Sequence, residues 1–436
     1  MIVILGCGES GMGAAMLAHK LSMPIFLSDY GRISQDFKSQ LIDKEIDFEE
    51  EGHNLVYEFL PDFVIKSPGI PDQSEVIKYF DQKGIKIISE IEFAFQYCKG
   101  QIIAITGSNG KTTTTNLLYH IMKNSGCDVV KVGNLGYSFA RSLAESSHDY
   151  YVVEVSSFQL DSTINFKPHI AILLNITPDH LDRYENNFEK YVFSKFSIAK
   201  NQTENDYLIL YKDAVVMKYF SSMKINAQTL WIQSELDQEG KVFINGKARF
   251  NFNHTVLKGR HNAINVSCAA TACEIIGLKD QEIQEGMYSF INDPHRLESI
   301  TTINGVEFIN DSKATNVDSV FWALDAMNSK IIWIAGGQDK GNDYTSIEDV
   351  VKNKVKTLVT LGKDNSKLIE FFGDYVPVID THDMKTAVHK SIEISERGDV
   401  ILLSPACASF DLFNNYMHRG DEFRKEVLKI KSETRK

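Results

Sequence analysis

The chain alternates short, almost uninterrupted apolar runs with longer stretches that have helical character. The runs are rich in β-branched residues, and many lead into loops rich in Gly, Ser, Thr or Asn. A strand that is apolar at nearly every position is buried on both faces, as in a parallel sheet covered by helices. The pattern therefore predicts an α/β protein with strands at Ile2–Leu5, Phe63–Lys66, Ile102–Thr106, Tyr150–Val155, Ile170–Asn175, Ile331–Gly336, Thr357–Gly362 and Val400–Ser404.

Three blocks of this kind follow one another without a long flexible linker. We expect domains over residues 1–97, 98–292 and 293–436, which suits a chain of 436 residues at about 100–200 residues per domain. The segment from Asp206 to Phe252 differs from the rest. It predicts a strand, a helix and a hairpin that turns at Asn245–Gly246.

The composition narrows the class of protein. Hydrophobic residues make up 43% and charged residues 24% of the chain, as in an ordinary folded protein. A formal net charge of −12 argues against a nucleic-acid binder, which usually has a basic surface. We find no membrane-spanning run and no secretory leader, so we expect a cytoplasmic location without membrane insertion. The six cysteines are scattered and predict reduced thiols.

The strongest chemical signal is the segment ITGSNGKTT at Ile105–Thr113, between an apolar strand and a helical run. A glycine-rich turn at a helix N-terminus directs backbone N–H groups at anionic oxygens. A lysine adds positive charge and a threonine hydroxyl suits Mg²⁺, although the usual first glycine of this motif is replaced here by Ile105. The predicted phosphate-binding residues are Gly107, Ser108, Asn109, Gly110, Lys111, Thr112 and Thr113.

Two further strand ends carry candidate metal ligands. Glu154 ends an apolar strand, where a carboxylate is costly without a partner. The next strand leads into NITPDHLDRY, which contains His180. Because parallel strands end on one edge of a sheet, we expect both residues near the phosphate loop. The sequence thus predicts a magnesium site there.

The N-terminal block carries a second glycine-rich loop, the G-x-G-x-x-G motif at Gly6–Gly11, with Asp29 about twenty residues further on. This spacing is typical of a site for a diphosphate-bearing ligand and does not require NAD. The third block places Lys313 and Lys340 in polar loops after strands, where two cations would suit a small dicarboxylate amino acid. Two phosphate-type loops favour an enzyme that joins a nucleotide-linked substrate to another molecule at the expense of ATP.

Taken in order, the motifs TGSNGKTT, VEVSSFQL, NITPDHLDRY, GRHNAINVSCAA, HRLE and INDSKATN resemble those of the Mur ligases. The last motifs, GGQDKG and SPACASFDLFNNYMHRGDEF, resemble the branch that adds D-glutamate. The resemblance implies a Rossmann-like N-terminal domain, a central P-loop ATPase-type domain and a Rossmann-like C-terminal domain. It also implies that the protein joins D-glutamate to UDP-N-acetylmuramoyl-L-alanine through an acyl phosphate, in peptidoglycan precursor synthesis. We expect a monomer.

The resemblance assigns roles to individual residues. The implied catalytic residues are Lys111, Glu154, His180 and Lys195, the last at a position that the family carbamylates. Two Mg²⁺ ions would be held by Thr112, Glu154, His180 and carbamylated Lys195. The implied ATP contacts outside the loop are Asn262, Asn265, Arg296 and Asp311. The implied contacts to the UDP-linked substrate are Ser10, Asp29, Arg32, Ser67, Pro68, Gly69, Asn134 and Ser156. The implied D-glutamate contacts are Lys313, Thr315, Lys340, Ser409, Phe410 and Tyr416.

Three alternatives stay open at this point. A related Mur ligase or a folylpolyglutamate synthetase would use another amino acid. The C-terminal motifs favour D-glutamate over this alternative. An NAD-dependent oxidoreductase would leave the loop at residues 107–113 and the other two domains without a role. A non-catalytic nucleotide-binding module would give no reason for Glu154, His180 and Lys195 to accompany a complete phosphate loop.

Overall fold

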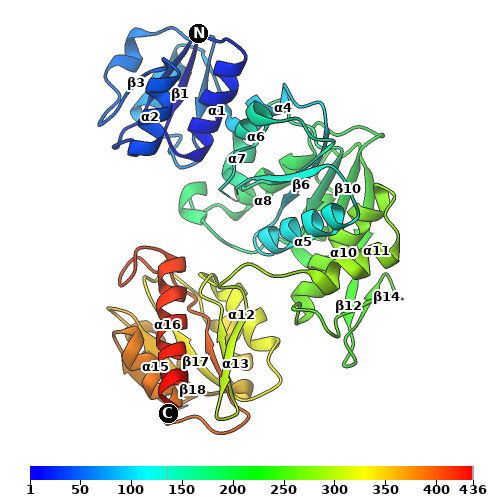
Figure 1. Cartoon of the computed structure of the whole chain (residues 1–436), viewed down its shortest axis with the longest axis vertical. Coiled ribbons are helices and arrows are strands. Elements are labelled where there is room, and N and C mark those ends of the chain that lie inside the picture. The colour runs from blue at the N-terminus through cyan, green and yellow to red at the C-terminus, as the bar shows by residue number, and fades with distance from the viewer. Residues whose placement is uncertain (135, 435–436) are drawn as a thin grey trace. The chain divides into compact units, whose positions relative to one another are not determined.

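The computed structural model describes residues 1–134 and 136–434 (Figure 1). Its contacts divide the chain into two compact units. One unit combines residues 1–251 with 264–290, and the other combines residues 252–263 with 291–436.

The N-terminal sheet is parallel and has helices on both faces (Figure 1). Its elements are β1 (Ile2–Leu5), α1 (Glu9–Lys20), β2 (Ile25–Ser28), α2 (Gln35–Asp43), β3 (Asp47–Glu49), β4 (Phe63–Lys66), α3 (Glu75–Gln82), β5 (Lys86–Ser89) and α4 (Glu90–Phe95). The strand order is β3-β2-β1-β4-β5. Ile2 and Ile4 enter the core that contains residues of α1, whereas Val3 and Leu5 enter the core that contains residues of α3. This explains why β1 is apolar at every position.

The central sheet is also parallel, with the order β11-β10-β9-β6-β8-β7. Its elements are β6 (Gln101–Thr106), α5 (Lys111–Asn124), β7 (Val129–Gly133), α6 (Phe139–Glu145), β8 (Tyr150–Glu154), α7 (Ser157–Asp161), β9 (Ile170–Leu173), η2 (Leu181–Tyr184), α8 (Phe188–Phe196), β10 (Tyr207–Tyr211), α9 (Ala214–Phe220), β11 (Gln228–Ile232), α10 (Arg260–Ile275) and α11 (Asp280–Ser289). Because β6 pairs with both β8 and β9, the loops after these three strands share one edge of the sheet.

A small antiparallel sheet follows the central strands, formed by β12 (Ser234–Leu236), β13 (Lys241–Ile244) and β14 (Lys247–Asn251). The turn between β13 and β14 is Asn245–Gly246, with φ of +50° and +79°. Positive φ at both central residues is the requirement of the tightest hairpin turns. The predicted hairpin is therefore confirmed.

The C-terminal sheet has the order β15-β16-β20-β17-β18-β19 and is parallel apart from its edge strand β15. Its elements are β15 (Glu298–Ile303), β16 (Val306–Asn310), α12 (Val317–Asp325), β17 (Ile331–Ala335), α13 (Glu348–Lys354), β18 (Val355–Leu361), α14 (Ser366–Phe372), β19 (Val378–Thr381), α15 (Met384–Glu393), β20 (Val400–Leu403) and α16 (Tyr416–Thr434). Trp333 of β17 packs in one core and its neighbours Ile332 and Ile334 pack in the core on the opposite face.

The predicted α/β class is confirmed, and every predicted apolar run contains a strand. Each predicted block contains one of the parallel sheets, while the domain limits themselves stay a prediction. Among the residues described, no helix combines the length and apolar character needed to cross a membrane.

Candidate functional site

The predicted phosphate loop leaves the carboxyl end of β6 and enters α5. Gly107 and Gly110 have φ of +155° and +85°, a region that residues with a side chain rarely adopt. A Cβ atom at Gly110 would lie only 2.4 Å from the Oδ1 atom of Asn265 in α10. The loop therefore requires glycine at this position, both for its backbone conformation and for the close approach of Asn265.

The segment after β9 holds the phosphate loop in place. The Asn109 amide donates to Asn175 Oδ1 at 2.9 Å, and Asn175 Nδ2 donates back to the Asn109 carbonyl at 3.1 Å. Ser108 Oγ donates to the Thr177 carbonyl at 2.9 Å. These bonds hold the loop conformation and tie it to the segment that carries His180.

Two lysines converge on one backbone oxygen of the loop. Lys111 Nζ donates to the carbonyls of Gly107 and Ser108 at 2.8 and 2.9 Å. Lys195 Nζ, from α8, donates to the same Gly107 carbonyl at 2.8 Å. Lys195 is buried, and burial together with the nearby charge of Lys111 holds its pKa well below the ordinary value. Both causes disfavour the protonated form of Lys195.

Glu154 presents an unsatisfied carboxylate oxygen at the end of β8. It is 2% exposed, and its Oε1 atom accepts a hydrogen bond from Asn134 Nδ2 at 2.8 Å. Its Oε2 atom is buried and has no hydrogen-bond partner in the described structure. A buried charged oxygen without a partner costs several kcal/mol in an apolar setting, so this position fits a cation. Thr112, in the first turn of α5, is also buried.

His180 lies at the start of η2 with φ of +51° and a side chain 49% exposed. Its ring packs edge-on against Phe158, with centroids 5.3 Å apart. Within the described residues, no cluster of three or more His, Cys, Asp or Glu side chains is arranged to hold a metal. A metal at this edge would therefore need other ligands beside Glu154 or His180, such as the hydroxyl of Thr112, a modified lysine, or phosphate oxygens of a substrate.

Asp29 of the N-terminal domain organises the first glycine-rich loop. Its two carboxylate oxygens accept hydrogen bonds from the backbone amides of Cys7 and Gly31, at 2.5 and 2.7 Å. Arg32 is 83% exposed and pairs with Glu51 at 2.6 Å. These contacts place Asp29 beside the first glycine-rich loop and pair Arg32 with a carboxylate on the surface.

Three other residues predicted to contact the UDP-linked substrate lie on loops or helix ends. Ser67 Oγ donates to the Gly6 carbonyl at 3.3 Å, so the segment after β4 lies against the glycine-rich loop. Ser10 is partly buried in the first turn of α1. Ser156 caps α7 and shares a capping box with Gln159.

The C-terminal sheet brings several predicted amino-acid contacts together. Lys313 Nζ donates to Tyr416 OH at 2.7 Å and lies 3.9 Å from the centre of that ring. Ser409 is buried, whereas Lys340 and Phe410 are exposed. Thr315 is partly buried in the loop before α12. The exposed lysine and phenylalanine are available to a ligand, because neither is used in the packed core.

The predicted ATP contacts of this unit include a protonation-sensitive group. Asp311 is buried and accepts from Ser404 Oγ at 3.0 Å and from the Leu297 amide at 3.1 Å. Burial raises its pKa to about 7, and the charge of Arg296 opposes this rise. Asn262 lies in the first turn of α10 and donates to the Lys258 carbonyl at 2.8 Å.

Sequence reasoning missed one residue, the buried Arg419 in α16. Its guanidinium donates to the carbonyls of Ser312, Cys407 and Gly336, at 2.9, 3.1 and 3.4 Å. These acceptors lie in the loops after β16, β20 and β17, the loops that carry the predicted D-glutamate contacts. Burial lowers the pKa of Arg419 to about 10. The HRGDEF motif contains Arg419 and was the signal in the sequence that could have identified it. An arginine in a helical segment is ordinarily predicted to lie on the surface.

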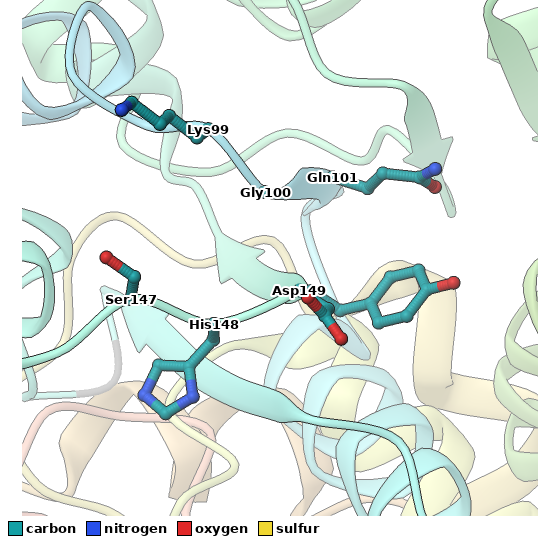
Figure 2. Close-up of a pocket in the computed structure, with 7 residues that line it drawn as sticks. Lys99, Gly100, Gln101, Ser147, His148 and Asp149 are labelled. Atoms are coloured by element: carbon teal, nitrogen blue, oxygen red, sulfur yellow. The ribbon is translucent and has the colours of Figure 1, made fainter.

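A separate surface pocket of about 480 Å³ lies away from this edge of the central sheet (Figure 2). It is formed at the opposite, amino ends of β6 and β8, around Gln101 and Tyr150. His148, which is one of the lining residues labelled in Figure 2, pairs with Asp128 at 2.7 Å. None of the predicted site residues lines this pocket, so the candidate site is the loop edge described above.

Three family models match the chain. Residues 105–273 match the Mur ligase middle domain, residues 295–407 match the Mur ligase glutamate ligase domain, and residues 1–76 match the MurD N-terminal domain. The UDP-N-acetylmuramoylalanine--D-glutamate ligase of Christiangramia forsetii is 46% identical, covering 98% of this chain and 99% of that protein. The ligase of the same name from Porphyromonas gingivalis is 45% identical, covering 98% of both.

Solved structures share the fold. The UDP-N-acetylmuramate-alanine ligase MurC of Thermotoga maritima superposes with a TM-score of 0.62 at 18% identity, over 99% of both chains. The MurF ligase of Thermotoga maritima, solved in complex with ADP, has a TM-score of 0.60 at 16% identity, over 93% of this chain and 95% of that one.

The fold and the phosphate loop define an ATP-dependent ligase of the Mur type. The chain belongs to the Mur ligase family, and within it to the UDP-N-acetylmuramoylalanine--D-glutamate ligases.

Proposed function

We propose that this protein joins D-glutamate to UDP-N-acetylmuramoyl-L-alanine with hydrolysis of ATP, as a step of peptidoglycan precursor synthesis. The observation that carries the proposal is the 46% identity to a ligase of this name over 98% of the chain. The phosphate loop supports it, because its glycines have positive φ and Lys111 lies at the start of α5, where a glycine-rich turn and a lysine suit phosphate groups.

The chemistry follows from the poor reactivity of a carboxylate. The terminal phosphoryl group of ATP passes to the carboxylate of the alanyl residue, which gives an acyl phosphate and ADP. The amine of D-glutamate then attacks the acyl carbon, the bond to the phosphate oxygen breaks, and inorganic phosphate leaves as the amine loses a proton. Negative charge moves along the phosphoryl oxygens throughout, so preorganised positive charge lowers the barrier.

Within this proposal, the loop from Gly107 to Thr113 holds the ATP phosphates and Lys111 neutralises charge on the transferred group. Asn262, Asn265, Arg296 and Asp311 contact the rest of the nucleotide. Thr112 and Glu154 would hold one Mg²⁺, and His180 with modified Lys195 would hold a second. Bound Mg²⁺ would neutralise phosphate charge. The unpartnered Oε2 atom of Glu154 supports this assignment.

We propose further that Lys195 is carbamylated. Its neutral amine would add to carbon dioxide and lose a proton, which gives a carbamate with two anionic oxygens. Its burial and its position beside Lys111 favour this change, because the anionic carbamate attracts the charge of Lys111 and the unmodified amine does not. The modified side chain would then be able to act as a metal ligand like a carboxylate.

Substrate contacts complete the proposal. The UDP-linked substrate would contact Ser10, Asp29, Arg32, Ser67, Pro68, Gly69, Asn134 and Ser156. D-glutamate would contact Lys313, Thr315, Lys340, Ser409, Phe410 and Tyr416. We also propose that the enzyme acts as a cytoplasmic monomer, which cell fractionation and sedimentation velocity would test.

The direct test measures phosphate release by the purified protein with ATP, Mg²⁺ and UDP-N-acetylmuramoyl-L-alanine. D-glutamate is compared with L-glutamate, L-lysine and meso-diaminopimelate. Release with D-glutamate alone, matched by an amide product, is the expected result. Release with another amino acid would keep the ligase chemistry and overturn the specificity, and no release with any of them would overturn the proposed function.

A further inference from the structure

Arg183 reaches from η2, after β9 of the central sheet, to the loop that follows β4 of the N-terminal sheet. We call residues Ser67–Pro71 the SPG loop. Arg183 Nη1 donates to the Pro68 carbonyl at 2.7 Å, and Nη2 donates to the Ile70 carbonyl at 3.4 Å. A planar guanidinium with two fixed donors can satisfy both carbonyls in only one orientation. The contact therefore specifies where the SPG loop lies relative to η2.

The same guanidinium is connected to His180 through one aromatic ring. The Arg183 guanidinium carbon lies 4.1 Å from the centre of the Phe158 ring, which is a close cation–π distance. The His180 ring packs edge-on against the same phenylalanine at 5.3 Å. Phe158 belongs to α7, which begins three residues after Glu154. A shift of Arg183 therefore changes the surface on which His180 rests.

The short segment that links the two residues leaves little room for independent movement. His180 and Glu185, on either side of η2, both have positive φ, at +51° and +55°. Backbone of this kind persists only when its surroundings hold it. Tyr184 is buried and donates to Asp161 Oδ2 at 2.8 Å, which anchors η2 to the end of α7.

The SPG loop is anchored on its own side as well. Ser67 Oγ donates to the Gly6 carbonyl of the glycine-rich loop at 3.3 Å. The buried Lys66, which precedes the loop, pairs with Asp72, which follows it. A ligand that shifts the glycine-rich loop therefore shifts the SPG loop as well, and with it the carbonyls that accept from Arg183.

We propose that Arg183 is a positioning residue that couples occupancy of the UDP-binding loops to the placement of His180. This inference rests on the proposed function, because it takes the SPG loop as part of the UDP-substrate site. Substrate bound against the SPG loop selects the arrangement in which the Pro68 and Ile70 carbonyls both accept from Arg183. In that arrangement Arg183 fixes the position of the Phe158 ring, against which the His180 ring packs. With His180 placed in this way, the UDP-linked substrate strengthens nucleotide binding at the phosphate loop. By linkage, the nucleotide then strengthens binding of the UDP-linked substrate by the same factor.

The test is calorimetric titration of UDP-N-acetylmuramoyl-L-alanine into the full chain, with and without a non-hydrolysable ATP analogue and Mg²⁺. We expect the analogue to tighten substrate binding by about fivefold or more in the unmodified protein, the lower end of ordinary coupling. In Arg183→Met this factor should fall below about twofold, while affinity for the analogue alone stays unchanged. Arg183→Lys, which keeps the charge and the fold but lacks the fork, should lose the coupling as well.

The matched control is Lys20→Met. Lys20 Nζ donates to the Leu143 carbonyl at 3.0 Å, so it also joins the N-terminal and central sheets, but through α1 and α6. The control should retain the full coupling factor. The proposal is overturned if the factor survives in both Arg183 variants, is lost equally in Lys20→Met, or is absent from the unmodified protein. Failure of the unmodified protein to bind the UDP-linked substrate at all would instead overturn the proposed function.

Discussion

Lys111 and Lys195 donate to the same backbone oxygen, the Gly107 carbonyl, each at 2.8 Å. Two ammonium groups that share one acceptor repel each other, so the protonated form of one of them is disfavoured. The lowered pKa of Lys195 identifies which one. This relationship links the geometry of the phosphate loop to the proposed carbamate.

The first prediction concerns that lysine. Lys195→Ala should lose most of the ligase activity, and short carboxylic acids should partly restore it by standing in for the carbamate. Lys190→Ala is the control, because Lys190 lies exposed on the same helix and pairs with the surface residue Glu185. Labelled bicarbonate should give a carbamate signal in the unmodified protein by NMR. Full activity of Lys195→Ala would remove the basis for the assignment.

The second prediction concerns D-glutamate. Lys340→Ala should raise the KM for D-glutamate by about tenfold or more, since a hydrogen bond to a charged group contributes roughly 1.5–3 kcal/mol. The KM for ATP should change little. Lys385→Ala, another exposed lysine of the same sheet domain, is the control for loss of surface charge. Equal losses for D-glutamate and ATP would contradict the placement of Lys340 in the amino-acid pocket.

The third prediction concerns Arg419. Arg419→Met should lower the free energy of unfolding by about 2–4 kcal/mol, because the buried carbonyls of Ser312 and Cys407 lose their donor. It should also raise the KM for D-glutamate, because three loops of the pocket lose their common anchor. Urea denaturation and steady-state kinetics measure the two effects. Arg424→Met, which breaks the partly exposed pair with Glu298, should cost about 1 kcal/mol or less.

The fourth prediction concerns pH. Glu90 is buried, accepts from Ser138 Oγ and the Ala140 amide, and burial raises its pKa to about 7. The folded state therefore retains a proton that the unfolded state releases at lower pH, so this group's contribution to stability falls as pH rises from about 4.5 to 7. Glu90→Gln should abolish that fall, which amounts to on the order of 3 kcal/mol. Denaturation midpoints measured across this range would test it, and parallel pH profiles for the two proteins would contradict it.

Much of the fold was predictable because its signals are local. A strand buried on both faces must be apolar along its length, so β1, β4, β6, β8 and β17 are visible in the sequence. The phosphate loop was predictable for the same reason, because its glycines, lysine and threonines lie within the segment Gly107–Thr113 and the backbone requirements at Gly107 and Gly110 act within a few residues.

The contacts that join distant segments were decided only by the tertiary structure. Lys195 meets Gly107 across 88 residues, Arg183 meets Pro68 across 115 and Arg419 meets Ser312 across 107. No local pattern marks an arginine or a lysine as buried, because its burial depends on which carbonyls the packed loops leave without donors. The sequence by itself determined the strands, the loops and the family, whereas packing decided which charged side chains hold those loops together.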